Sequence, residues 1–289
     1  MNVLISADME GTCGVVSWVQ VMPPESFGDE VTNQTEYERA RLRMTREVNA
    51  AIEGALAGGA DEIIVNDSHD GMRNLIPEEL HPRCRFISGN DKLLGMMQGV
   101  DLDGIGAVFF TGYHARAGTP AAPLAHTWTG WLNDVRFNGR STGEFGINAA
   151  IAGHFGVPVA LVTGDDKAVA QTRDLLGDRV EGVVVKEGLS TFAALHLHPA
   201  VAVERIREGA ERAIRDVRSG TSTTRPFTLD PGTTVELDFD HQALADQAAL
   251  APGIERVGDR TIAFHPNDGL ELNRTFRAVM KLAGIRMSP

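Results

Sequence analysis

Five residues in the first half of this 289-residue sequence could bind divalent cations, and each stands where a strand or a tight turn is predicted to end. They are Asp8, Glu10, His69, His114 and Glu144. Carboxylates and imidazoles without thiolates suit Zn²⁺ or Mn²⁺ with open coordination positions rather than a cysteine-rich structural zinc site. Ligands for two such ions would form a hydrolytic centre, because paired cations polarise a carbonyl or phosphoryl oxygen and lower the pKa of water.

The first two acids alternate along one extended segment. Ser6, Asp8 and Glu10 are two residues apart, so their side chains point to the same side of the chain. Gly11 allows the backbone to turn sharply directly after them. For this segment alone, a turn cap at Asp8 and a solvated acid at Glu10 explain the pattern as well as a metal site does. The residues that follow the neighbouring strands are therefore needed to distinguish these two interpretations.

Each of the two histidines follows an apolar run that predicts a buried strand. His69 comes after the run 62–66, and His114 comes after the run 106–112. Because the carboxyl ends of parallel strands meet at one edge of a sheet, both imidazoles are expected beside the paired acids. A lone histidine in such a position is more often structural than a ligand. Two of them facing paired acids favour a metal site.

The interpretations of Glu144 and His126 stay open at this point. Glu144 lies in the first turn of a predicted helix over 143–154, where the helix dipole favours an acid even without a function. His126 lies within a predicted strand, Leu124–Trp128, and it fits a core histidine, a metal ligand or a free acid–base group equally well. Both residues are therefore candidates for the site.

Alternating strands and helices are expected to position these residues. Apolar runs predict buried strands at 2–8, 62–66, 106–112 and 157–162, and helical periodicity predicts helices at 34–57, 143–154 and 199–218. The order of strand, helix and strand indicates a parallel sheet covered by helices. An Asn138-Gly139 turn after the run 133–137 indicates a hairpin, so the sheet is expected to be mixed.

Together these elements predict an α/β fold, namely a three-layer α/β/α arrangement with a largely parallel, mixed sheet plus a smaller C-terminal α/β unit. Residues 1–190 are predicted to form the metal-binding catalytic core. Residues 191–289 are predicted to form the C-terminal unit packed on that core, and a single intertwined domain is the alternative.

The composition disfavours several classes of function. The sequence has 27 Lys and Arg against 39 Asp and Glu, and the net charge of −12 repels nucleic acid and anionic membranes. No apolar run approaches the roughly 18 residues that a membrane helix needs, and no secretory signal is recognised. Two cysteines without a CxxC motif fit a reducing compartment. We therefore expect a cytoplasmic protein with no nucleic-acid or membrane partner.

Several motifs resemble those of the zinc-dependent D-aminopeptidase family. The segment Ser6–Gly11 matches the S-x-D-x-E-G signature of that family. The segments Asn66–His69, Gly112–Ala117 and Gly143–Asn148 resemble later motifs of the family in the same order. The resemblance covers most of the chain, and it is densest before about residue 167.

The resemblance implies both a site and an activity. It implies two zinc ions per subunit, held by Asp8, Glu10, His69, His114 and Glu144, with Asp8 as the bridge. It places His126 at the position of an active-site histidine that acts in catalysis. Members of the family remove the N-terminal residue from short peptides of D-alanine type and assemble as decamers of two stacked pentameric rings. The same substrate class and homo-oligomer are expected here.

The leading hypothesis is thus a two-zinc aminopeptidase, and two alternatives accompany it. The first is another binuclear metallohydrolase on the same ligands, such as an L-aminopeptidase, an amidase or a phosphoesterase. The lack of a clustered Arg/Lys phosphate clamp near the ligands disfavours a phosphoesterase. The second is a non-catalytic dipeptide-binding protein with a structural metal, and the absence of an export signal disfavours a periplasmic role for it.

Overall fold

Two sheets organise the part of the chain that the computed structural model describes, residues 1–27, 33–221 and 224–285. The larger sheet has the strand order β3-β2-β1-β4-β7-β8-β9. Its strands are β1 (Asn2–Ala7), β2 (Ile63–Asp67), β3 (Cys84–Ile87), β4 (Ile105–Tyr113), β7 (Val159–Asp165), β8 (Glu181–Ser190) and β9 (Ala193–His196). All neighbours pair in parallel except β8 and β9. The predicted α/β fold with a largely parallel, mixed sheet is therefore confirmed.

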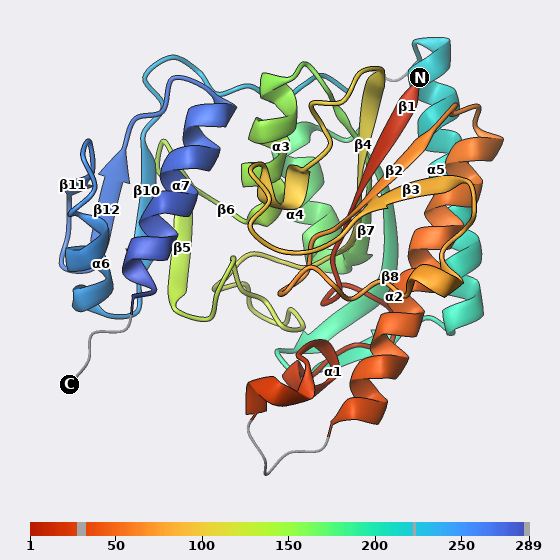
Figure 1. The fold of residues 1–289 in the computed structure, drawn as a ribbon, viewed down its shortest axis with the longest axis horizontal. Helices are drawn as coiled ribbons and strands as arrows, with labels where there is room; N and C mark the ends of the chain where they lie inside the picture. Colours follow the sequence, from red (N-terminus) through yellow and green to blue (C-terminus); the bar gives the residue numbers. More distant parts are fainter. Residues whose placement is uncertain (28–32, 222–223, 286–289) are drawn as a thin grey trace.

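Helices cover both faces of this sheet, which explains why its central strands are apolar on both sides. One face carries α2 (Gln34–Ala57) and α5 (Pro199–Ser219), and the other carries α3 (Glu144–His154) and α4 (Asp166–Leu176). Alternate residues of β1 enter different cores: Val3 and Ile5 pack with α2 and α5, whereas Leu4 packs on the side of α3. The result is the predicted three-layer arrangement (Figure 1).

The helices α2 and α5 lie against each other at unusually short range, because glycines replace side chains at their contact. A Cβ on Gly54 would lie 2.1 Å from the carbonyl oxygen of Arg207, and one on Gly58 would lie 2.7 Å from that of Glu211. The positive φ of 98° at Gly59 then ends the first of these helices. This close pair forms a firm backing for the strands that carry the site.

The second sheet is antiparallel, with the order β11-β12-β10-β5-β6. Its strands are β5 (Leu132–Phe137), β6 (Arg140–Thr142), β10 (Val235–Phe239), β11 (Glu255–Arg256) and β12 (Thr261–Phe264). The predicted hairpin at Asn138-Gly139 joins β5 to β6, and both turn residues have positive φ. Because β5 pairs with β10, strands from both sides of residue 190 share this sheet. The division into 1–190 and 191–289 as separate units stays a prediction.

Helix α6 (Gln242–Ala248) packs on β10 and β12 of the second sheet and on α7 (Gly269–Ala283), which also packs on α3 of the larger layer. Figure 1 shows α7 lying beside the second sheet, on the side that faces the rest of the molecule. A Cβ on Gly269 would lie 2.0 Å from the carbonyl oxygen of Ala150, so the start of α7 approaches α3 closely. In the described ranges, no helix has both the length and the apolar character needed to cross a bilayer.

The strand predicted at Leu124–Trp128 is wrong, because this segment is irregular apart from a single bridge between Thr127 and Thr129. Leu124 and Trp128 have φ values of 52° and 66°, which a strand does not allow. The turn at Trp128 directs its backbone N–H to Oε1 of Glu144 at 2.7 Å. The segment is therefore a loop that contacts the predicted ligands.

Candidate metal centre

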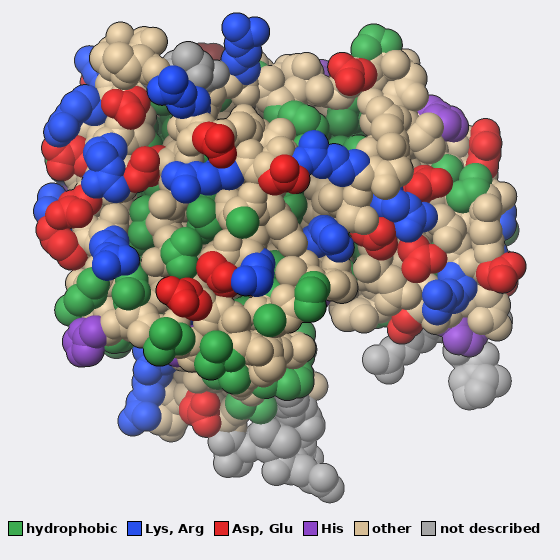
Figure 2. All heavy atoms as spheres, turned by 180° about the vertical axis from the view of Figure 1, so that it is seen from behind, with side chains coloured by type: hydrophobic (Ala, Val, Ile, Leu, Met, Phe, Trp, Pro, Cys, Tyr) green, Lys and Arg blue, Asp and Glu red, His purple; other side chains and the backbone are tan. Residues whose placement is uncertain are grey.

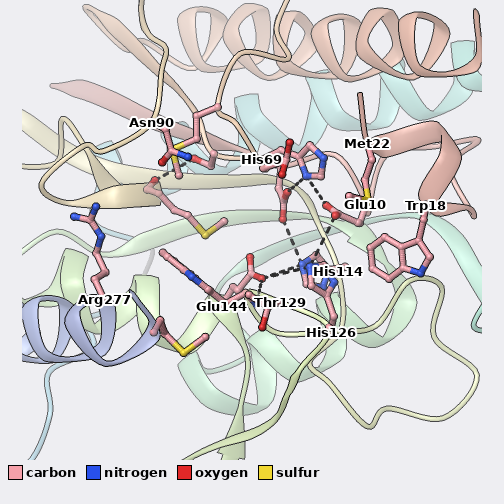
Figure 3. A pocket seen from close by; sticks show the side chains of 18 of the residues that line it. Glu10, Trp18, Met22, His69, Asn90, His114, His126, Thr129, Glu144 and Arg277 are labelled. Carbon is pink, nitrogen blue, oxygen red and sulfur yellow. Dashed lines mark hydrogen bonds and ion pairs between the residues drawn. The ribbon is translucent and has the colours of Figure 1, made fainter. Parts of the chain in front are cut away.

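The carboxyl ends of three neighbouring strands bring the predicted ligands to one edge of the larger sheet. Asp8 follows β1 directly, and His114 follows β4 directly. His69 comes two residues after β2, and Glu144 is the first residue of α3. Figure 3 shows that the labelled side chains of Glu10, His69, His114 and Glu144 point toward a common centre. The structure therefore brings all five predicted ligands together.

The first group of potential ligands consists of Asp8, Glu10 and His69, whose ligand atoms lie within 4.8 Å of one another. His69 Nδ1 lies 3.2 Å from Asp8 Oδ1 and 2.9 Å from Glu10 Oε2. The other ring nitrogen, Nε2, lies 2.7 Å from the carbonyl oxygen of Val21. Because a carbonyl oxygen can only accept, Nε2 carries a hydrogen, and Nδ1 faces the carboxylates. There Nδ1 donates when the ring is protonated, and in the neutral ring it offers its lone pair to a cation held between these groups.

The second group consists of His114, His126 and Glu144, whose ligand atoms also lie within 4.8 Å of one another. His114 Nε2 lies 3.3 Å from Glu144 Oε1. His114 Nδ1 lies 3.0 Å from the carbonyl oxygen of Ala115, and His126 Nδ1 lies 2.8 Å from that of Leu124. Each ring thus repeats the arrangement of the first group, with one nitrogen donating to a backbone carbonyl and the other facing carboxylates.

Asp8 lies between the two groups. Its Oδ1 faces His69, and its Oδ2 lies 3.5 Å from His114 Nε2. Within the described part of the chain, Asp8 Oδ2 and Glu10 Oε2 are buried and accept no hydrogen bond, although His69 Nδ1 lies close to the latter. Buried carboxylate oxygens are normally paired, so these two oxygens fit coordination to a cation. Oxygen and imidazole donors without sulfur are those of catalytic zinc sites.

The buried charges of the two groups shift one another's pKa values. Burial raises the pKa of Asp8 to about 8, and the Glu10 charge adds to the rise. Burial also opposes ionisation of Glu10 and Glu144, but the imidazoles outweigh it and hold both pKa values low. The carboxylates raise the pKa of His114 to about 10 and that of His69 well above its ordinary value, against the effect of burial. The site therefore concentrates negative charge that protons or a metal cation must balance.

His126 differs from the other imidazoles in its charge and exposure. Burial and the nearby His114 lower its pKa, which favours the neutral ring. The two rings are stacked with their centroids 4.0 Å apart, and Trp18 meets His126 edge-on at 5.2 Å. His126 Nε2 lies 3.9 Å from both Glu10 Oε1 and Glu144 Oε1, and its side chain is 15% exposed. A neutral imidazole at this position can accept a proton or bind a cation.

Two glycines allow the ends of β1 and β4 to come together. A Cβ on Gly11 would lie 1.9 Å from the carbonyl oxygen of Tyr113. Gly112 has a φ of 68°, and a Cβ there would lie 2.2 Å from the carbonyl oxygen of Asp8. A side chain at either position would push the first two acids away from His114. The glycine of the S-x-D-x-E-G segment is thus required by packing.

Lys186 on β8 supports the ligand segment from within the core, and the sequence patterns did not indicate it. Its Nζ donates to the carbonyl oxygens of Glu10, Thr12 and Val15, the last two at 3.1 and 2.7 Å. Burial lowers the pKa of Lys186 to about 8. The available signal was a lysine directly after the apolar run 183–185, because a charged residue in a buried strand needs partners.

A cavity of about 730 Å³ opens in front of the two ligand groups. One side, here called the sheet-edge wall, consists of Asp8, Glu10, His69, His114 and Glu144. Another side, here called the helix wall, consists of Arg277, Met280 and Lys281 of α7. Trp18, Met22 and His126 also line the cavity. Its volume suits a small-molecule ligand. The sequence patterns indicated the sheet-edge wall but not the helix wall.

Comparison with known proteins adds three findings. Residues 1–278 match the family model described as D-aminopeptidase. A D-aminopeptidase of Bacillus subtilis (strain 168) is 35% identical over 284 residues, which cover 98% of each chain. Among solved structures, the chain is similar to the Zn-dependent D-aminopeptidase DppA from Bacillus subtilis, described as a self-compartmentalizing protease. That structure is 33% identical, with a TM-score of 0.86 and complete coverage of both chains.

Proposed function

Since the chain belongs to the D-aminopeptidase family, we propose that it is a zinc-dependent aminopeptidase that removes the N-terminal residue from short peptides. One observation carries the proposal. The imidazoles of His69 and His114 each donate one ring N–H to a backbone carbonyl and turn the other nitrogen toward buried carboxylates. Orientation by a hydrogen bond behind the ring is typical of histidines that hold a metal.

The proposed centre holds two zinc ions. Asp8, Glu10 and His69 would hold one ion, and His114 and Glu144 would hold the other, with Asp8 shared between them. This assignment rests on the two ligand groups and on the position of Asp8 between His69 and His114. Zinc bound at such a site would polarise a peptide carbonyl and would lower the pKa of a bound water molecule toward neutrality.

His126 is proposed as the residue that transfers protons. Its Nε2 faces Glu10 and Glu144 from the cavity side, and its depressed pKa leaves the ring neutral and able to accept a proton. In hydrolysis it would take a proton from the attacking water and return it to the leaving amine. The hydrogen bond from Nδ1 to the carbonyl of Leu124 keeps Nε2 as the reacting nitrogen.

A preference for D-alanine-type peptides and a decameric assembly complete the proposal. The first is supported by the D-aminopeptidase description of the Bacillus subtilis relative. The second is supported by the self-compartmentalizing description of the similar structure and by three exposed apolar residues on the β8–β9 hairpin. Leu189, Phe192 and Leu195 are 65%, 59% and 62% exposed. Hydrophobic side chains also gather near the lower edge of the face drawn in Figure 2. The cytoplasmic location stays a prediction from the sequence.

The proposal is tested by metal analysis together with hydrolysis of matched dipeptides. The purified protein should contain two zinc ions per chain and should hydrolyse D-Ala-D-Ala faster than L-Ala-L-Ala. Chelation should abolish the activity, and added zinc should restore it. Full activity after chelation would contradict a metal centre, and equal turnover of both dipeptides would remove the D preference. Analytical ultracentrifugation separates a decamer from smaller assemblies.

A further inference from the structure

A second polar site lies in the cavity, at a distance from the metal centre. Arg277 of α7 belongs to the helix wall. Figure 3 shows its guanidinium across the cavity from the side chains of Glu10, His69 and His114. The cavity is therefore bounded by carboxylates and imidazoles at one end and by a cation at the other.

Arg277 keeps most of its hydrogen-bonding capacity. Its Nη1 donates to the carbonyl oxygen of Leu93 at 2.7 Å, and its remaining donors form no hydrogen bond with the described residues. The other cation of the helix wall, Lys281, pairs with Asp91 Oδ1 at 2.9 Å. Asp91 is thus engaged by the lysine, and the positive charge of Arg277 lacks a carboxylate in contact among the described residues. An anion that entered the cavity could therefore bind there.

The side chain of Arg277 passes close to Gly95, where an added Cβ would lie 3.9 Å from its Cδ and Nε and 3.7 Å from the Trp128 ring. That ring packs edge-on against Phe276 at 5.1 Å, so the preceding residue of α7 is fixed as well. Burial lowers the pKa of the guanidinium, with Asp91 opposing the shift. A partly desolvated cation is stabilised when an anion pairs with it.

We propose that Arg277 binds the terminal carboxylate of the peptide substrate, an inference that rests on the proposed aminopeptidase function. A planar guanidinium binds a carboxylate through two parallel hydrogen bonds, which a lysine cannot reproduce. The metal centre acts at the amino end of the peptide, and Arg277 lies across the cavity from it. The cavity would then recognise both ends of one molecule. The substrates would be short peptides with a free carboxyl terminus.

The test compares two substrates that differ only at the carboxyl end, D-Ala-D-Ala and D-alanyl-D-alaninamide. The amino end and the scissile bond are the same in both. A charge-assisted pair predicts that the native enzyme prefers the free acid by roughly 10- to 100-fold in kcat/KM. Arg277→Met should lower kcat/KM for the free acid to the value for the amide, chiefly through KM. Its kcat/KM for the amide should stay within about twofold of the native value.

Two further variants separate charge from structure. Asn273→Ala removes the other side-chain hydrogen bond to the Leu93 carbonyl, which Asn273 Nδ2 donates at 2.9 Å, and it keeps the guanidinium. It should preserve the preference for the free acid. If Asn273→Ala removes the preference as fully as Arg277→Met does, the effect belongs to the loop at Leu93 and the proposal is wrong. Arg277→Lys should restore part of the preference, because a point charge remains without the fork.

The outcomes distinguish this inference from the proposed function. Native protein that hydrolyses both substrates equally overturns the carboxylate site and leaves the aminopeptidase proposal intact. Native protein that contains zinc but hydrolyses neither substrate overturns the aminopeptidase proposal. The comparison of the two substrates on native protein needs no variant, so a failure of Arg277→Met to fold does not remove the test.

Discussion

The sheet-edge wall and the helix wall of the cavity differ in how firmly the chain holds their polar groups. On the sheet-edge wall, Asp8 and His114 are 3% and 4% exposed, and the imidazoles are oriented by backbone carbonyls. On the helix wall, the side chain of Lys281 is 71% exposed and pairs with Asp91, which is 80% exposed. Groups that act on the scissile bond must be held within about 0.5 Å of the productive geometry by the residues around them. We infer that rigid support is concentrated where the bond is broken.

If this comparison is right, the largest effect should come from removing an imidazole of the sheet-edge wall. His69→Ala leaves Asp8 and Glu10 without their shared neighbour and should abolish both zinc binding and hydrolysis of D-Ala-D-Ala. Zinc content and kcat/KM are the measurements. His265→Ala, at an exposed position outside the site, is the matched control and should change neither. Zinc retained at the native level in His69→Ala would break the assignment of this wall.

The next effect separates a ligand from a proton carrier within the same region. His126→Ala should leave the zinc content unchanged and lower kcat about 10²- to 10⁴-fold, as expected for the loss of a general acid–base group. The circular dichroism spectrum should stay the same, because the side chain borders the cavity. Loss of one zinc ion per chain would instead make His126 a third ligand of the second group, together with His114 and Glu144.

The stability of the protein should depend on pH, because a buried carboxyl group lies behind the segment that carries the first two acids. Glu47 of α2 accepts a hydrogen bond from the backbone N–H of Cys13, and burial raises its pKa to about 7 from 4.5. The folded state therefore binds the proton more tightly than the unfolded state, and its stabilisation is lost as pH rises from 4.5 through 7. The loss should be on the order of 3 kcal/mol in the free energy of unfolding.

Urea unfolding at pH 5 and pH 8 measures this effect. The native chain should lose stability between the two values relative to Glu47→Gln, which stays neutral and can still accept from Cys13. Equal pH dependence in the two proteins would show that Glu47 ionises freely. The support behind the ligand segment would then be less rigid than its burial indicates.

The smallest effect is expected on the helix wall. Lys281→Met removes an exposed ion pair with Asp91, and such pairs contribute little to stability because solvent screens them. The free energy of unfolding and the hydrolysis of D-Ala-D-Ala should both be almost unchanged. Steady-state kinetics and urea unfolding are the measurements. A large rise in KM would mean that Lys281, and not Arg277, meets the substrate carboxylate, which would sharpen the comparison by moving the recognition site along α7.

The sheet-edge wall could be predicted from the sequence because its signals are local. An apolar run followed by a polar residue indicates the carboxyl end of a buried strand, and parallel pairing brings such ends together. Asp8 and His114 follow this rule, and in the structure Asp8 Oδ2 lies 3.5 Å from His114 Nε2. Their role as metal ligands stays a prediction.

The helix wall could not be predicted, because its position depends on contacts between distant segments. In the sequence, Arg277 is one of several charged residues on an amphipathic helix, and nothing local separates it from the others. Its place in the cavity results from the docking of α7 on α3 and on the carbonyl of Leu93, 184 residues earlier. The sequence predicts a strand where the loop at Leu124 and Trp128 lies, because neither residue type favours the positive φ that both adopt.

Lys186 bears on when the metal site can form during synthesis of the chain. Its ammonium group donates hydrogen bonds to the carbonyl oxygens of Glu10, Thr12 and Val15, which precede it by 176, 174 and 171 residues. During synthesis, the segment after β1 therefore leaves the ribosome long before the lysine that holds it. Domains fold as units while chains are made at about 5 to 20 residues per second, so the ligands would wait many seconds for β8. Acquisition of metal is thus expected as a late event in the maturation of the nascent chain.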